Sequence, residues 1–235
     1  MYQKPASCDQ LPEGNTVGSL EVPIMLCARK NLVLRVNVRQ REILIGCVLG
    51  DATIRPKGQI RIEQSNAQKD YVIWKYDELK SLAYPASPRE IVREYKKRNK
   101  QYASIYFVLR QYFRPWRTIF YSEGKKVFPE GLQLTPMSLA VWYMDDGCWT
   151  GEKVIISTDC FDLLSMQRVQ NVLLEQFGIE TVIGSNKKLT IRKNSHNKFL
   201  EVILPHIIPS MRYKLPDPVT TFPIRRRRSR EELEK

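Results

Sequence analysis

The sequence predicts an α+β protein that contains two copies of one structural unit. Segments with helical periodicity alternate with segments in which polar and apolar residues alternate, and the same order of elements occurs twice. With 235 residues, of which 43% are hydrophobic, the chain is long enough to bury one large core or two small ones. No apolar stretch approaches the length of a membrane span, so we expect neither a membrane protein nor a membrane partner.

The first unit begins with a helix near residue 37. Asn37 is a favourable N-cap with Gln40 at the capping-box position, and an apolar run follows through Leu49, so the helix should end near Gly50 and Asp51. Residues 59–65 alternate between polar and apolar and predict a strand, 70–82 predict a helix, and 89–110 predict a hairpin that turns near Asn99.

The second unit begins at Thr135, an N-cap that Pro136 follows at the first helical position. Strands are predicted at 153–158, 179–184 and 187–193, with a Ser-Asn turn between the last two, and helices at 161–177 and 195–204. Each unit therefore runs helix, two strands, helix, two strands, helix. We divide the chain into an N-terminal extension (1–36), two units (37–131 and 132–220) and a basic tail (221–235). Pro, Gly and Ser are mixed in the extension, which we expect to be loosely docked.

The net charge of the chain is strongly positive. Its 38 Lys and Arg against 25 Asp and Glu give +13, which favours a polyanionic partner such as nucleic acid over the alternative of a merely soluble basic protein. Five scattered cysteines without a CxxC pair, and two histidines, indicate neither a disulfide framework nor a zinc site. We expect an intracellular protein of an organelle or of a bacterial or archaeal cytoplasm. Any metal should be bound by oxygen atoms.

Two matched strings carry the candidate chemistry. "LIGCVLGDA" (44–52) and "LAVWYMDDG" (139–147) each end a helix with an aspartate, and their alignment places Asp51 opposite Asp146, 95 residues later. A single such ending is ordinarily a glycine cap beside a solvated aspartate. Gly46 and Gly50, four residues apart, permit a second helix to approach closely and would bring the two carboxylates together. Because carboxylates at helix C-termini repel the helix dipoles and each other, a divalent cation such as Mg²⁺ would relieve the conflict.

These strings resemble the two motifs of a single-chain LAGLIDADG homing endonuclease, and "TPMSLA" and "YKLP" are similar to strings of its intron-encoded branch. The resemblance runs from about Asn37 to Pro216. It departs from the family pattern at Cys47 and Leu49 in the first motif, and at Val141 and Asp145 in the second. It implies two pseudo-symmetric αββαββα units that form a saddle, with antiparallel DNA-binding sheets and a two-helix central interface. It also implies a monomeric enzyme that breaks both strands of a long DNA site by metal-dependent hydrolysis and leaves 3′ overhangs.

The family pattern assigns roles to six residues. Asp51 and Asp146 bind the metal, expected to be Mg²⁺ with Mn²⁺ or Ca²⁺ able to replace it in binding, whereas Asp145 matches a position that does not ligate. Lys126 in "KKVFP" and Lys214 in "RYKLP" lie near the scissile phosphates, where they stabilise charge. Glu63 and Ser157, at similar points of their units, are assigned to the positioning of solvent.

The predicted ribbons also supply residues for DNA contact, by base recognition or by phosphate binding. They are Arg55, Lys57, Gln59, Arg61, Gln64, Arg93, Lys97, Tyr102, Ser104 and Tyr106 in the first unit, and Lys153, Lys188, Thr190, Arg192 and Lys193 in the second.

Three alternatives remain open at this point. The chain could be an RNA maturase that binds its host intron RNA, a non-cleaving DNA-binding relative, or a generic RNA-binding protein, although it contains no recognisable RNA-binding motif. The tail "RRRRSREELEK" could be a phosphate clamp or a solvated tail.

Overall fold

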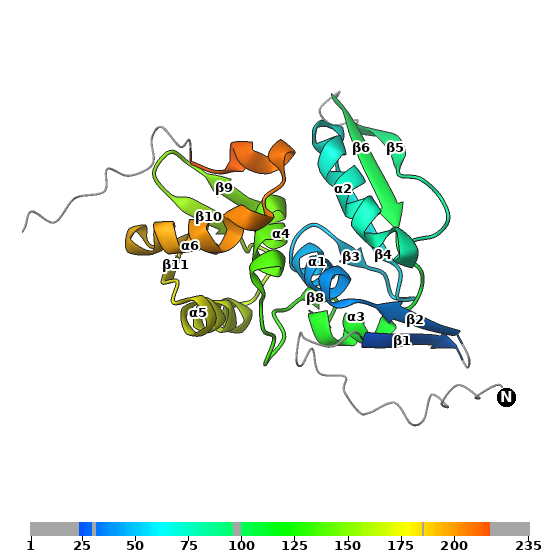
Figure 1. Ribbon diagram of the computed structural model, residues 1–235, viewed down its shortest axis with the longest axis horizontal. Helices are drawn as coiled ribbons and strands as arrows, with labels where there is room; N and C mark the ends of the chain where they lie inside the picture. Colours follow the sequence, from blue (N-terminus) through cyan, green and yellow to red (C-terminus); the bar gives the residue numbers. More distant parts are fainter. Residues whose placement is uncertain (1–23, 30–31, 96–99, 185, 217–235) are drawn as a thin grey trace, which may run out of the picture.

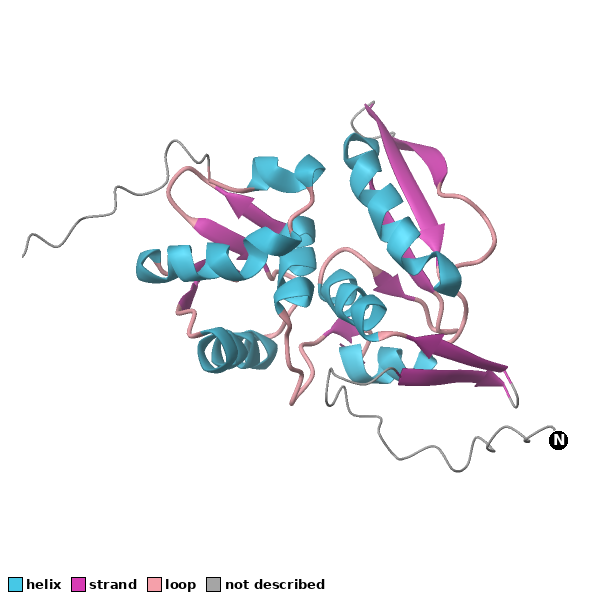
Figure 2. Ribbon diagram, in the orientation of Figure 1, coloured by secondary structure: helices cyan, strands magenta, loops and turns pink. Residues whose placement is uncertain are grey.

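The structure, a computed structural model, describes residues 24–29, 32–95, 100–184 and 186–216. Two halves, each with its own four-stranded antiparallel sheet, lie on either side of a central helix pair, α1 and α4 (Figure 1). In the part of the chain that is described, helices pack against each sheet, and Figure 2 shows helices and strands in separate layers within each half. The expected α+β architecture with duplicated units is confirmed.

The first half follows the predicted order of elements. Asn37 and Gln40 form the expected capping box at the start of α1. The strand order of the sheet is β3-β4-β6-β5, and α2 packs on β4 and β6. Its elements are α1 (Val38–Leu49), β3 (Thr53–Ile54), β4 (Ile60–Ser65), α2 (Lys69–Leu79), β5 (Arg89–Tyr95), β6 (Lys100–Val108) and α3 (Arg114–Phe120). The predicted turn near Asn99 lies outside the described residues.

The second half repeats this order. Thr135 caps α4 and forms a capping box with Ser138, and Pro136 occupies its first turn. The strand order β11-β12-β10-β9 is the same as that of the first sheet when corresponding strands are matched. Its elements are α4 (Pro136–Asp146), β9 (Gly147–Trp149), β10 (Val154–Ser157), α5 (Leu163–Phe177), β11 (Thr181–Ile183), β12 (Lys188–Ile191) and α6 (His196–Ile203).

Short 3₁₀ helices connect or extend several of these elements. Those relevant to the site are η2 (Asn66–Gln68), η6 (Leu204–His206) and η7 (Pro209–Lys214), the last of which closes the described part of the chain.

Helices α1 and α4 pack directly against each other, and glycines on α1 allow the close approach. A Cβ atom at Gly46 would lie 2.5 Å from the Ser138 carbonyl oxygen and 2.6 Å from Val141 Cβ. One at Gly50 would lie 2.5 Å from Asp145 Cβ. The small residues therefore belong to α1, and they accommodate Val141 and Asp145, where α4 departs from the family pattern.

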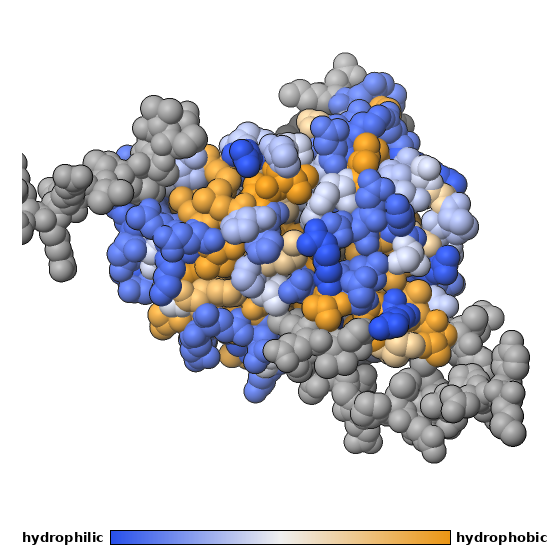
Figure 3. All heavy atoms as spheres, in the orientation of Figure 1, coloured by the Kyte–Doolittle hydropathy of each residue, from blue (hydrophilic) through white to orange (hydrophobic). Residues whose placement is uncertain are grey.

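The expectation of a loosely docked extension is wrong for the part of residues 1–36 that is described. Strands β1 (Ile24–Arg29) and β2 (Leu32–Val36) form an antiparallel hairpin, and Leu26, Leu34 and Val36 are buried in the core. Burial of these alternate side chains stabilises the hairpin against the first half. Apolar atoms also reach the surface at this hairpin (Figure 3), where Met25 and Val33 are each 45% exposed.

A second hairpin, absent from the sequence prediction, joins the two halves. It consists of β7 (Tyr121–Ser122) and β8 (Lys125–Lys126), and its turn contains Glu123 and Gly124 at positive φ. The hairpin fixes the backbone position of Lys126.

Candidate functional site

Asp51 and Asp146 lie at the ends of the two central helices. Asp51 follows Gly50, the C-cap of α1, and Asp146 is the last residue of α4. Burial, followed by the nearby charges of Asp51 and Asp145, raises the pKa of Asp146 to about 7. Burial, followed by the charge of Asp145, also raises the pKa of Asp51. The charge of Asp51 thus disfavours ionisation of Asp146, as expected for carboxylates at two adjacent helix ends.

Lys126 and Lys214 approach the same two helix ends. The Lys126 ammonium donates to the carbonyl oxygen of Gly50, at the end of α1. Lys214 Nζ donates to the carbonyl oxygens of Met144 (2.5 Å) and Asp145 (2.7 Å), at the end of α4. Burial lowers the pKa of both lysines. Each half thus places one carboxylate and one lysine at the C-terminus of its central helix, where a cation is favourable.

Asp145 is the centre of a buried polar cluster that joins the two halves. Its Oδ1 accepts from Lys75 Nζ of α2 at 2.6 Å, and both side chains are fully buried. Gln64 Nε2 donates to the same oxygen at 2.8 Å, and the Asp51 N–H points to Oδ2 at 3.3 Å. Burial opposes the charge of Lys75, but the attraction of Asp145 and its neighbours leaves the pKa of this lysine raised. The carboxylate of Asp145 is therefore occupied by contacts within the protein, and its omission from the metal ligands stays a prediction.

The prediction that Gln64 contacts DNA is wrong. The glutamine is buried on the core face of β4, and its amide donates to Asp51 Oδ2 (3.1 Å) as well as to Asp145. The physical reason is strand parity, because side chains alternate between the two faces and Gln64 lies on the face opposite to Arg61 and Glu63. Gln64 therefore contacts Asp51 and Asp145 and does not reach the open face of the sheet.

The sequence contained a signal for Lys75, which the prediction missed. Lys75 shares the buried side of α2 with Tyr71, Val72 and Leu79, so a charge interrupts the apolar stripe of this helix. A lysine in such a position is seldom fully buried without a partner. The identity of that partner, 70 residues further along the chain, has no local signature.

Glu63 and Ser157 lie at corresponding positions on the open faces of β4 and β10, as predicted. Glu63 accepts from Ser104 Oγ (2.6 Å) and Arg61 Nε (2.6 Å) and forms an ion pair with Arg93. These donors, with Arg93 first, lower the pKa of Glu63 to about 2. None of these contacts involves Asp51 or Asp146, so the role of Glu63 and Ser157 in the positioning of solvent stays a prediction.

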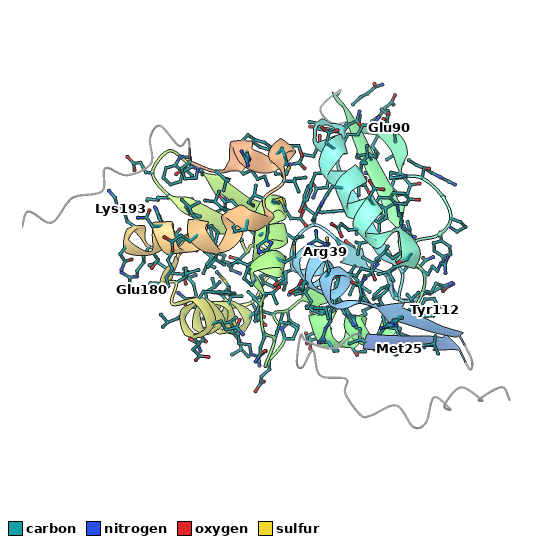
Figure 4. The ribbon with its side chains drawn as sticks, in the orientation of Figure 1. Met25, Arg39, Glu90, Tyr112, Glu180 and Lys193 are labelled. Carbon is teal, nitrogen blue, oxygen red and sulfur yellow. The ribbon has the colours of Figure 1, made fainter. Side chains whose placement is uncertain are left out.

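The remaining candidate DNA contacts are distributed over both sheets and their connecting turns. Arg61 lies over the Tyr106 ring, with its Cζ atom 3.6 Å from the ring centroid, and Ser104 is buried beneath Glu63 and Arg93. Lys193 lies at the outer edge of the second half, as Figure 4 shows. Lys97 is outside the described residues. Those at least partly exposed are Arg55, Lys57, Gln59, Arg61, Arg93, Tyr102, Tyr106, Lys153, Lys188, Thr190, Arg192 and Lys193.

The donor set at the helix ends fits a hard divalent cation that a substrate helps to hold. Asp51 and Asp146 offer carboxylate oxygens whose mutual repulsion a cation would relieve. Gln64 Oε1 is a buried acceptor without a hydrogen-bond partner in the described part of the chain, and its amide already contacts Asp51. Within the described ranges, no three His, Cys, Asp or Glu side chains converge on one point. Two carboxylates would leave room for water and phosphate oxygens in the coordination of a metal such as Mg²⁺.

No helix in the described residues is both long and apolar enough to cross a bilayer.

Comparison with known proteins identifies relatives that share this architecture. The chain is 31% identical to the cytochrome b mRNA maturase bI2 of Saccharomyces cerevisiae over 209 residues, which cover 76% of this chain and 48% of the maturase. It is 25% identical to a protein RecA of Mycolicibacterium chitae over 208 residues, which cover 77% of this chain and 47% of that protein. The chain therefore spans about half the length of each of these relatives.

A solved structure shares the fold. The homing endonuclease I-WcaI bound to its DNA recognition sequence superposes with a TM-score of 0.67 at 24% sequence identity, over 76% of this chain and 86% of that one.

The match to a family covers both candidate motifs. The LAGLIDADG DNA endonuclease family matches residues 41–199, a range that contains Asp51 and Asp146 and both sheets. With its duplicated units and paired central helices, the chain belongs to the LAGLIDADG DNA endonuclease family.

Proposed function

We propose that this chain is a site-specific, intron-encoded homing endonuclease that cuts both strands of a long double-stranded DNA target and leaves 3′ overhangs. The observation that carries the proposal is the pairing of Asp51 and Asp146 at the α1–α4 interface, one from each half, with a lysine beside each helix end. A protein that only binds DNA gains nothing from carboxylates that repel the phosphate backbone. Their presence favours catalysis over simple binding.

The two halves would each supply one reactive centre. Asp51 and Asp146 would hold Mg²⁺, which in phosphodiester hydrolysis lowers the pKa of an attacking water and stabilises the leaving oxygen. Lys126 and Lys214 place positive charge at the same helix ends, where a phosphate oxygen that gains charge would be stabilised. From the protein side, Gln64 donates to the carboxylate of Asp51, and Asp145 accepts from the Asp51 backbone N–H.

The duplicated halves suit an asymmetric DNA site bound by one chain, so we propose that the enzyme acts as a monomer. Basic residues on and around the open sheet faces would bind phosphates, and the affinity should fall with added salt.

A plasmid cleavage assay tests this proposal. The substrate is a plasmid in which the two flanks of the host intron are joined without the intron. The control plasmid carries the same flanks separated by the intron, so that the target site is interrupted. With Mg²⁺, the first plasmid should become linear with 3′ overhangs at one position, whereas the control plasmid and an EDTA-treated reaction should remain circular. The absence of a linear product from the first plasmid would overturn the proposal.

An RNA maturase is the second candidate, because the similar protein from S. cerevisiae is named as an mRNA maturase. A splicing assay with the host intron RNA separates the two functions. Maturase activity should survive Asp51→Asn and Asp146→Asn, since carboxylates that hold a catalytic metal have no part in RNA binding, whereas DNA cleavage should not.

A further inference from the structure

The open faces of the two sheets can be compared residue by residue, because the sheets have the same strand order and antiparallel pairing. Thr53 and Cys148 each lie two positions after the candidate metal-binding aspartate of their half. In the first sheet Thr53 pairs with Arg61, and in the second Cys148 pairs with Ile155. Arg61 and Ile155 therefore occupy corresponding places on the two faces.

The open face of the first sheet is polar and charged. Arg61, Glu63 and Arg93 form a connected ion-pair network on it. Tyr106, which pairs with both Glu63 and Arg89, lies in the next position across the sheet. Although Ile91 and Val108 also belong to this face, charged and hydroxyl-bearing groups dominate it.

The open face of the second sheet carries a largely apolar row. Ile155 pairs with Cys148 on one side and with Thr190 on the other, and Thr190 pairs with Val182. Cys148 is exposed, Val182 is 42% exposed, and the other two are half-buried. A solvated sheet face ordinarily carries polar residues. This row of four side chains, Cys148, Ile155, Thr190 and Val182, is called the apolar row below.

The surroundings of the apolar row indicate nucleic acid as its occupant. Its first strand, β9, begins directly after Asp146, so the row is continuous with the candidate metal site. The next pair along the same face is Ser157 with Lys188. The exposed Lys153 lies just before β10, and the exposed Arg192 and Lys193 lie just after β12, where Arg192 also pairs with Glu180 at 3.7 Å. Cationic side chains around an apolar row would complement the phosphates that flank the base edges in a DNA groove.

We infer that the apolar row recognises thymine, through the C5-methyl groups that thymine presents in the major groove. This inference rests on the proposed function. Apolar side chains and the threonine methyl group are the partners that thymine methyls take in direct readout, whereas arginine pairs with guanine. The two halves would then differ in chemistry: at corresponding places, Arg61 favours guanine in one half-site and Ile155 favours thymine in the other.

Selection from a randomised double-stranded DNA library, with Ca²⁺ in place of Mg²⁺ to permit binding without cleavage, supplies the target. Arg61→Ala and Ile155→Ala then assign its halves, because each variant should relax base preference only in the half-site that its sheet contacts. Ile155→Val serves the same purpose if the alanine variant does not fold.

The decisive measurement uses the wild-type protein and the selected duplex with deoxyuridine in place of thymine, which removes only the methyl groups. Substitution in the half-site assigned to Ile155 should weaken binding about fourfold for each contacted methyl. The same substitution in the half-site assigned to Arg61 is the matched control and should change affinity less than twofold. In addition, Ile155→Arg should shift the preferred base at the Ile155-dependent position from thymine to guanine.

The outcomes separate this inference from the proposed function. If no sequence emerges from the selection, site-specific DNA recognition fails and the inference fails with it. If a sequence emerges but deoxyuridine is tolerated equally in both halves, or the Ile155-dependent positions are not thymine, the inference alone is overturned. The apolar row would then serve another partner.

Discussion

Single residues decide how three neighbouring carboxylates share one region. Asp145 is neutralised by Lys75 inside the protein, whereas Asp51 and Asp146 have raised pKa values because burial and like charges oppose their ionisation. The aspartate pair in "MDDG" is thus divided between a structural role for Asp145 and, in our proposal, a metal-binding role for Asp146. The stability of the fold alone would not favour the Asp146 carboxylate, because burial and like charges oppose its ionisation.

Lys75→Met tests the buried ion pair. Removal of the lysine leaves the Asp145 charge buried without its main partner, and we expect the free energy of unfolding to fall by about 3–5 kcal/mol. Urea unfolding of the purified variant measures this loss. The matched control is Lys75→Met combined with Asp145→Asn, which removes both charges and should recover most of the stability. Equal destabilisation of the single and double variants would show that the pair has no such role.

Glu63→Gln tests the charge network on the first sheet through its pH dependence. The pKa of Glu63 lies at about 2, below its ordinary 4.5, so its ion pairs stabilise the fold fully above pH 4.5 and less as the pH falls toward 2. The stability difference between the wild type and Glu63→Gln should therefore shrink over this window, as chemical unfolding at several pH values would show. The control is Glu152→Gln in an exposed turn, which should give a small difference at every pH. A Glu63→Gln difference that stays constant from pH 5 to pH 2 would refute the assignment.

At the scale of elements, the position of the site follows from the packing of α1 on α4. The glycines of α1 bring its backbone against Ser138, Val141 and Asp145, and the same contact brings the two helix C-termini together. Capping boxes at Asn37 and Thr135 fix where each helix begins. The lengths of the helices then determine where the candidate ligands lie.

Gly46→Ala and Gly50→Ala test this packing by the sign of their effect. At Gly46, inside α1, helix propensity alone would make alanine more favourable than glycine by about 1 kcal/mol. Because the new methyl groups would overlap Ser138 and Asp145, we expect a net loss of about 1–3 kcal/mol in the free energy of unfolding. Asn171→Ala, at an exposed position of α5, is the control and should stabilise slightly. Stabilisation by either glycine variant would contradict the close approach of the two helices.

Much of the whole molecule could be predicted from its sequence, because the decisive signals were local. Capping residues, strand alternation and the duplicated motif predicted the central helices and both sheets. The β1–β2 hairpin was missed, since Pro, Gly and Ser in the preceding residues obscured the alternation of Leu26, Leu34 and Val36. Gln64 was assigned to the wrong face of its strand, because the alternation of side chains that places it opposite to Arg61 and Glu63 was not taken into account. The Lys75–Asp145 pair could not be predicted, because it depends on how the two halves meet.

The whole molecule carries the central claim, which is that one carboxylate from each half is required for a double-strand break. Neither half contains a complete pair, so the site exists only when α1 and α4 are packed together. Loss of either carboxylate should therefore be as harmful as loss of the other.

The most direct test measures linear product from the target plasmid with Mg²⁺ for the wild type, Asp51→Asn and Asp146→Asn. We expect each variant to retain its fold and its DNA binding in Ca²⁺ but to lose linear product at least about 100-fold, as is typical when a group that stabilises transition-state charge is removed. Asp159→Asn, at an exposed position, is the control and should cut like the wild type. Undiminished linearisation by either Asp51→Asn or Asp146→Asn would contradict the account.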